Sequence, residues 1–139
     1  MKPGVYRGAS GIYFNFIGDG GREPTVPRTD FQHSYGLMMD VAEGSYGQLL
    51  DHFNDQSTVD QLLSNLWIIF ITHLHADHHL GTIKMVHEWL RALWSMFTEE
   101  ELATNPDDHC IYVIVPYFME EWILDSIKET DLVWVVHLN

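Results

Sequence analysis

The feature that most constrains the fold is a short apolar segment, residues 67–72 (WIIFIT). It is rich in β-branched and aromatic residues, and the polar run 73–79 follows it directly. A short segment that is apolar on both faces is typical of a strand inside a sheet that is covered on both sides. The sequence therefore predicts a buried central strand with a polar site at its carboxyl end.

Other segments predict the elements around this strand. The first two expected strands form an antiparallel pair, and alternation of strands and helices then indicates an α/β layer architecture. Ser57 or Thr58 is the expected N-cap of the second helix, Pro116 opens the last helix, and residues 98–108 read as an acidic connection. Strands are expected at 10–16, 35–41, 67–72, 110–115 and 132–137, and helices at 45–53, 58–66, 82–97 and 117–128.

Composition limits the class of protein. The 139 residues include 7 Lys and Arg against 20 Asp and Glu, a net charge of −13, and the length suits one domain. This charge argues against a free-standing basic nucleic-acid binder but does not exclude a nucleic-acid enzyme. The longest apolar run, 66–71, is too short to cross a bilayer, so no membrane association is expected. The single cysteine, Cys110, excludes an intramolecular disulfide and is expected in the core.

Four ligand-type residues lie directly after the central strand with H-x-H-x-D-H spacing: His73, His75, Asp77 and His78. In an extended segment, the first two histidines project to the same side and can converge on one ion. Asp77 and His78 follow where the chain turns into a helix, so they can face a second ion. Imidazole and carboxylate are ligands that zinc prefers. The spacing therefore predicts a two-metal site.

Two other interpretations of this segment stay open at this point. One is a solvated loop that happens to be rich in histidine. The other takes Asp77, His78 and His79 as the D-H-H signature of a different class of metal-dependent phosphoesterase. The upstream residues His73 and His75 favour the H-x-H-x-D-H interpretation.

Residues 72–81 (THLHADHHLG) resemble the motif of the metallo-β-lactamase superfamily in the variant of the tRNase Z family, the endoribonucleases that process tRNA 3′ ends. The resemblance is to the catalytic half of the eukaryotic long form. Residues 37–49 (LMMDVAEGSYGQL) and 6–10 (YRGAS) are similar to two further segments of that family. The resemblance implies a metallo-β-lactamase fold, an αββα sandwich. Residues 1–139 are expected to form a partial domain, about the first half of it.

The resemblance also implies roles for individual residues. His73 and His75 correspond to ligands of one zinc ion, and Asp77 and His78 to ligands of the other. Asp77 is also the expected catalytic residue, which handles the proton of the attacking water. His79 belongs to the same string but is not a ligand in the family.

Two acidic residues further upstream are expected near this site. Asp40 and Glu43 correspond to residues that lie beneath or beside the metals, where they orient the ligands or face the substrate. The implied reaction is hydrolysis of one phosphodiester, which releases the 3′ trailer from precursor tRNA, with two zinc ions roughly 3.5–4 Å apart. The family is associated with the nucleus and the mitochondrion, so an intracellular location is expected.

The sequence departs from the family pattern downstream. The family needs two further histidines and a bridging aspartate, but His87, His109 and His137 lack the family's context and are expected to be structural or surface residues. Asp131 lacks the glycine-rich context of the bridging aspartate. Because catalytic zinc sites usually have three protein ligands per ion, we expect the isolated chain to be inactive and to bind zinc weakly.

The same departures leave the rest of the protein as an expected partner. We expect the missing domain portions to carry the remaining ligands and the basic RNA-binding surface, and we expect an apolar sheet face to be exposed without them. Two alternatives to the endoribonuclease stay open. One is another metallo-β-lactamase-fold hydrolase that acts on a small ester, and the other is a non-catalytic pseudoenzyme or interaction module.

Overall fold

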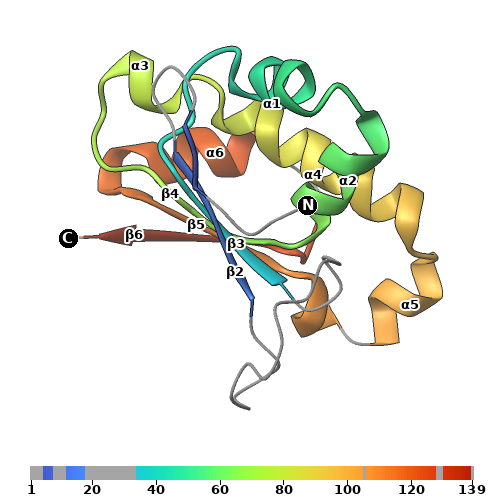
Figure 1. Cartoon of the computed structure of the whole chain (residues 1–139). Coiled ribbons are helices and arrows are strands. Elements are labelled where there is room, and N and C mark those ends of the chain that lie inside the picture. Colours follow the sequence, from blue (N-terminus) through green and yellow to red (C-terminus); the bar gives the residue numbers. More distant parts are fainter. Residues whose placement is uncertain (1–4, 8–11, 18–33, 105, 128–129, 139) are drawn as a thin grey trace.

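The computed structural model of the chain describes residues 5–7, 12–17, 34–104, 106–127 and 130–138, and these form an α/β structure around one sheet (Figure 1). The strands are β1 (Val5–Arg7), β2 (Ile12–Ile17), β3 (Ser34–Met39), β4 (Leu66–Phe70), β5 (Ile111–Pro116) and β6 (Val133–Leu138). The α-helices are α1 (Ser45–Phe53), α2 (Gln56–Ser64), α3 (Ala76–His79), α4 (Thr82–Met96), α5 (Glu99–Thr104) and α6 (Glu120–Ser126). Two short 3₁₀ turns, η1 (Pro106–His109) and η2 (Tyr117–Met119), complete the described elements.

The strands follow one another in the sheet in chain order, β1 to β6. β1, β2 and β3 are antiparallel neighbours, which confirms the predicted antiparallel pair, and β3 to β6 are parallel. Each parallel connection carries helices, and right-handed crossovers between successive neighbouring strands place those helices on the same side. Figure 1 shows α1, α2, α4 and α6 on one side of the sheet.

The helices bury one face of the parallel strands completely. Ile69 and Val113 on this face are fully buried, as are Leu62 of α2 and Leu93 of α4. Trp89 of α4 is also buried, whereas Trp94 is exposed. The two tryptophans differ because Trp94 falls on the solvent side of this amphipathic helix.

The opposite face of the sheet is apolar and exposed among the residues that the structure describes. Trp134 of β6 is 54% exposed and Leu138 is 53% exposed, and Trp67 of β4 is exposed as well. The expectation that β4 is covered on both sides is therefore wrong within this part of the chain. The expectation that an apolar sheet face is exposed is confirmed. The register places side chains of this face in two cross-strand rows: Leu37, Ile68, Tyr112 and Trp134 in one row, and Met39, Phe70, Ile114 and Val136 in the next.

The start of α2 differs from the prediction. The helix begins at Gln56, and its N-cap is Asp55 rather than Ser57 or Thr58. The Asp55 carboxylate accepts hydrogen bonds from both the backbone N–H and the hydroxyl of Thr58. These bonds lower the pKa of Asp55, with the hydroxyl bond the larger contribution. Aspartate is as good an N-cap residue as serine and better than threonine, so residue type alone does not place the cap at Ser57 or Thr58.

The acidic connection is more ordered than expected, because it contains α5 and η1. Thr98 and Glu101 form a capping box: the Thr98 N–H donates to Glu101 Oε2 at 2.7 Å, and the Glu101 N–H donates to Thr98 Oγ1 at 3.2 Å. The T-x-x-E pattern is a known N-terminal signal of a helix, so the sequence contained the information that would have predicted α5.

A polar network ties α1, α2 and α4 together on their outer surface. Arg91 donates to Asp60 at 2.7 Å, to Tyr46 Oη at 3.2 Å and to Glu88 at 2.6 Å, and Lys84 donates to Glu88 at 2.7 Å. Burial raises the pKa of Glu88, but the hydrogen bonds from Lys84 and Arg91 outweigh it, so the net pKa is lowered. The network fixes α1, and with it the segment that leads from β3 to this helix.

Cys110 is buried, as predicted for a small core residue. No helix in the part of the chain that the structure describes is both long and apolar enough to span a lipid bilayer.

Candidate metal centre

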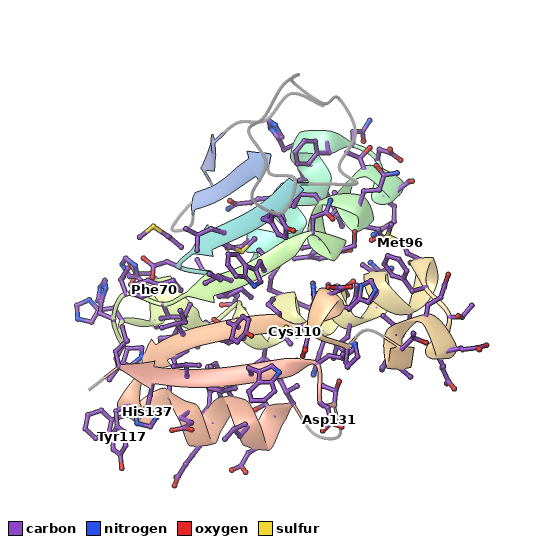
Figure 2. The ribbon with its side chains drawn as sticks, turned by 90° about the horizontal axis from the view of Figure 1, so that it is seen from below. Phe70, Met96, Cys110, Tyr117, Asp131 and His137 are labelled. Carbon is purple, nitrogen blue, oxygen red and sulfur yellow. The ribbon has the colours of Figure 1, made fainter. Side chains whose placement is uncertain are left out.

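The predicted site lies where the parallel strands end. The motif follows β4 through Ile71 and Thr72 and enters the single turn of α3. In Figure 2, Phe70, Tyr117 and His137 mark this end of the sheet, whereas Cys110 and Asp131 mark the opposite end. In open α/β sheets, ligands bind outside the carboxyl ends of the strands, so this is the end at which a site is expected.

The structure brings the four motif residues together. The ring centroids of His73 and His78 are 3.9 Å apart, those of His73 and His75 are 4.6 Å apart, and those of His75 and His78 are 6.5 Å apart. Asp77 is exposed, and its Oδ2 lies 3.5 Å from His78 Nε2. Three imidazoles and one carboxylate therefore share a small volume of the surface.

Asp40 lies beneath this group and holds it from the end of β3. Its side chain is largely buried, and its backbone has a positive φ of 57°, which a non-glycine residue rarely adopts. The carboxylate accepts hydrogen bonds from the backbone N–H of Thr72 at 2.8 Å and from the Thr72 hydroxyl at 2.9 Å. His78 Nδ1 lies 2.8 Å from the other carboxylate oxygen. A strained backbone that aims one carboxylate at several partners is typical of functional sites.

These contacts determine which nitrogen atoms of the rings are free. An ionised Asp40 carboxylate only accepts hydrogen bonds, so both His78 Nδ1 and the Thr72 hydroxyl donate to it. The hydroxyl has one proton, so it accepts from His73 Nδ1, which lies 2.8 Å away. Both rings then carry a proton on Nδ1, so in the neutral imidazole, the form that binds a metal, Nε2 is the nitrogen with a free lone pair. Histidine ligands of metals are usually oriented in this way by a carboxylate behind them.

Thr72 is a functional residue that the sequence analysis missed. Its hydroxyl joins the Asp40 carboxylate to the ring of His73, and its backbone N–H adds a second bond to the same carboxylate. A threonine between a buried strand and the first histidine was the available signal. It was not decisive, because nothing in the sequence places Asp40 opposite Thr72.

Backbone hydrogen bonds attach the motif to the segment after β3. The Val41 N–H donates to the carbonyl of His78 at 2.7 Å, and the Gly81 N–H donates to the carbonyl of Val41 at 2.9 Å. A Cβ atom on Gly81 would lie only 2.0 Å from the carbonyl oxygen of Ala42. Glycine is therefore required at position 81 by the close approach of two backbone segments.

His79 supports the loop from behind. Its Nε2 lies 3.1 Å from the carbonyl oxygen of Leu74, and its ring contacts Trp122 of α6 with a centroid distance of 5.5 Å. The first contact closes the loop that contains His75 and His78, and the second docks this loop on α6.

The remaining sequence candidates lie apart from this group. Glu43 is exposed, and it has no hydrogen bond to the motif among the described residues. His87 is exposed on α4, the ring of His109 packs on Phe97 at 4.5 Å, and His137 pairs with Glu120 at 2.5 Å. Among the residues that the structure describes, no group of three His, Cys, Asp or Glu side chains is arranged to hold a metal ion.

The donor set nevertheless fits zinc in its chemistry. His73 and His78 present their Nε2 atoms, His75 lies beside His73, and Asp77 adds an exposed carboxylate. Borderline divalent ions prefer this combination of nitrogen and oxygen ligands. The described residues supply part of a coordination sphere, and a complete one needs further donors.

A cavity of about 670 Å³ opens beside the two leading histidines. Thr72, His73 and His75 line one side of it, and Tyr117 and Phe118 of η2 line the other. The sequence analysis missed these two aromatic residues as cavity residues, because it assigned them to the first turn of a longer helix, 117–128.

Comparison with known proteins relates this motif to a family. The Zinc phosphodiesterase ELAC protein 2 of Macaca fascicularis is 32% identical over 114 residues, which are 78% of this chain and 13% of the macaque protein. The Ribonuclease Z of Saccharomyces cerevisiae is 33% identical over 113 residues, 75% of this chain and 12% of the yeast protein. The chain is a homologue of ribonuclease Z. It spans about an eighth of the length of these two relatives.

Other comparisons agree with this relationship. The Ribonuclease Z 2, mitochondrial, of Schizosaccharomyces pombe is 29% identical over 81% of this chain and 16% of the fission-yeast protein. The structure of a long form RNase Z from yeast superposes with a TM-score of 0.59 at 24% identity, over 91% of this chain and 15% of that one. The human short form tRNase Z (ELAC1) gives a TM-score of 0.53 at 19% identity, over 99% of this chain and 40% of that one. No protein-family model matches the chain. The two superpositions confirm the expected α/β class and its likeness to ribonuclease Z, a metallo-β-lactamase fold.

Proposed function

We propose that this chain forms the histidine- and aspartate-bearing part of a zinc-dependent endoribonuclease of the tRNA 3′-end processing type. The observation that carries the proposal is the arrangement around Asp40. One carboxylate there holds Nδ1 of His78 directly and Nδ1 of His73 through Thr72, which leaves Nε2 of each neutral ring as the nitrogen that can bind a metal. A solvated loop rich in histidine has no need of such a support.

In this proposal the motif residues have separate tasks. His73 and His75 hold one zinc ion, and Asp77 and His78 hold a second. Zinc in such a site acts as a Lewis acid that stabilises charge on the phosphoryl oxygens and activates water. Asp77, whose carboxylate is exposed beside His78, accepts the proton of the attacking water. Asp40 keeps the imidazoles in the ligating orientation, and exposed Glu43 faces the substrate.

The proposed substrate is precursor tRNA, and the reaction removes its 3′ trailer. The names of the relatives, zinc phosphodiesterase and ribonuclease Z, support a metal-dependent phosphodiesterase. One relative is named mitochondrial. We propose that this chain also acts inside the cell, in the mitochondrion or the nucleus.

Further polypeptide completes the site in this proposal. The relatives are about eight times longer than the matched segment, so they have ample chain for the missing zinc ligands and for a basic RNA-binding surface. The exposed apolar face of the sheet, which includes Trp134 and Leu138, is the surface on which that polypeptide packs. On its own, with two ligands for each ion, the chain is inactive.

One observation favours a second candidate, a non-catalytic interaction module. The described residues contain no group of three side chains arranged to hold a metal ion. A chain of this kind would keep the fold and the partner surface without hydrolysing a phosphodiester.

A chimera separates these functions. The matched 113 residues of the Saccharomyces ribonuclease Z are replaced by the corresponding residues of this chain, and cleavage of a 3′-extended precursor tRNA is measured with and without His75→Ala. We expect the chimera to cleave the precursor tRNA. We expect His75→Ala to lower the cleavage rate by a factor of about 100 or more, which is the usual effect of removing one group that stabilises the transition state (~10²–10³-fold). A folded, zinc-loaded chimera that is inactive would favour the interaction module, and one that hydrolyses only a small ester would indicate the other hydrolase class.

A further inference from the structure

We propose that Tyr117 and Phe118 form a stacking shelf for an unpaired nucleobase of the RNA next to the cleaved phosphodiester. This inference rests on the proposed function and adds a binding site to it. The shelf and the leading histidines of the motif line the same cavity of about 670 Å³. A phosphodiester held at the histidines therefore has a neighbouring nucleotide in that cavity.

The two aromatic side chains are unusually exposed. Tyr117 is 58% exposed and Phe118 is 78% exposed, and their ring centroids lie 5.5 Å apart at an interplanar angle of 73°. They sit in η2, which begins directly after Pro116 at the end of β5. The next residue, Met119, turns into the core and is buried. Met119 therefore anchors the turn in the core, and the rings of Tyr117 and Phe118 remain in solvent. Packing of the core does not explain why these two residues are aromatic.

The shelf is also held in place. The ring of Tyr117 contacts the ring of His137 with a centroid distance of 5.0 Å, and Figure 2 shows these two residues side by side. His137 is in turn paired with Glu120 at 2.5 Å. A contact surface that is ordered before binding loses less conformational entropy when a ligand arrives.

The chemistry of the surroundings favours a base over a phosphate at this position. The cavity lining contains no lysine or arginine among the described residues, and Glu120 and Glu121 follow the shelf in sequence. Carboxylates beside the shelf repel phosphate, whereas a base presents a neutral, flat surface to an aromatic ring. Stacking of this kind tolerates any base, because every base has a π-face. The shelf therefore selects an unpaired nucleotide without reading its identity.

Binding of a short RNA tests the shelf on the full chain with zinc present. The probe is a 2′-O-methylated single-stranded pentanucleotide with a terminal fluorophore, compared with a series in which each position in turn is abasic. We expect Phe118→Ala to weaken binding of the intact pentanucleotide about tenfold, within the range for loss of one stacked base. Phe118→Trp keeps the binding. The matched control is Trp94→Ala, which removes an equally exposed aromatic side chain from α4, far along the chain from the cavity.

The abasic series shows whether stacking is the cause. If the shelf holds a base, one abasic position weakens binding to the native chain, and Phe118→Ala adds no further loss to that probe, because the two changes remove the same contact. Equal binding by the native chain and Phe118→Ala, an equal loss in Trp94→Ala, or no binding of the pentanucleotide at all would overturn the shelf. His75→Ala tests the proposed function separately: unchanged, zinc-independent binding in that variant would contradict the metal site and leave the shelf standing.

Discussion

The two faces of the sheet carry similar apolar side chains but differ in how far those side chains are exposed to solvent. On the face toward the helices, Ile69 and Val113 are fully buried. On the other face, Trp134, Val136 and Leu138 are about half exposed, although their side chains are also largely apolar. The composition of the strands therefore does not report how many of their faces the described chain covers. Under the function proposed above, the open face is covered by further polypeptide, and both faces of the strands are then buried.

The candidate site lies at the edge shared by the two faces. The motif is attached to the helix-covered side through the backbone bonds of Val41 and Gly81, and the cavity beside it reaches Leu138 on the open side. The helix-covered side positions the ligands that this chain supplies. The open side is where we propose that the rest of the protein approaches.

The largest expected difference between the faces comes from truncating one side chain on each. Ile69→Ala leaves a cavity in a packed core and is expected to lower the free energy of unfolding by about 2–5 kcal/mol. Val136→Ala on the open face is expected to change it by less than about 0.5 kcal/mol. Urea unfolding monitored by circular dichroism measures both. Equal losses would show that the open face is packed in solution.

Gly81→Ala tests how tightly the motif is attached to the helix-covered side. The added methyl group meets the carbonyl oxygen of Ala42, so the two backbone segments must separate, at an expected cost of about 1–3 kcal/mol. The same unfolding assay measures the loss. Gly47→Ala is the matched control, because a Cβ atom at Gly47 has nothing within 4 Å. An unchanged midpoint for Gly81→Ala would mean that the close approach is absent.

The polar network on the helices predicts a pH dependence. The net pKa of Glu88 is lowered, because the hydrogen bonds from Lys84 and Arg91 outweigh the effect of burial. The stability that its carboxylate contributes is therefore complete above the ordinary pKa of glutamate and is lost as the pH falls through the lowered value. Glu88→Gln is expected to be less stable than the native chain at pH 7, by up to about 1 kcal/mol. The difference should vanish in urea titrations at a pH below the lowered pKa of Glu88, and a difference that grows on acidification would contradict this assignment.

The smallest expected effect on stability comes from making the open face polar. Trp134→Ser combined with Val136→Thr removes exposed apolar surface and is expected to change the unfolding midpoint little, because neither side chain is buried. The variant should bind the dye ANS more weakly and associate less in analytical ultracentrifugation. Dye binding equal to that of the native chain would place the exposed apolar surface elsewhere.

The sequence predicted the elements with strong local signals and missed those that depend on tertiary contacts. α1 was predicted at its observed bounds, and the 3.6-residue period predicted α4 to within one residue. For β4 the sequence predicted burial of both faces, but the described chain buries only one. An apolar strand has the same sequence pattern whether one layer or two layers cover it. α5 was missed although Thr98 and Glu101 carry a capping box.

In the candidate site, too, local sequence patterns predicted some features, and others depend on tertiary contacts. The spacing of the motif predicted that His73, His75, Asp77 and His78 lie together, and the structure brings them together. The link from Asp40 through Thr72 joins residues 32 positions apart in sequence, so no local pattern could predict it. The cavity beside Tyr117 and Phe118 depends on the parallel pairing of β4, β5 and β6, which places three strand ends side by side.

The central claim is that Asp40 leaves the Nε2 atoms of His73 and His78 free to bind zinc. Zinc titration of the ¹⁵N-labelled full chain, monitored through the imidazole nitrogens by NMR, tests it most directly. The account predicts that Nε2 of His73, His75 and His78 shifts on titration with weak affinity, that Nδ1 of His73 and His78 stays protonated, and that Asp40→Asn weakens the binding. Shifts confined to His52, His87 or His109, or zinc bound through Nδ1, would contradict it.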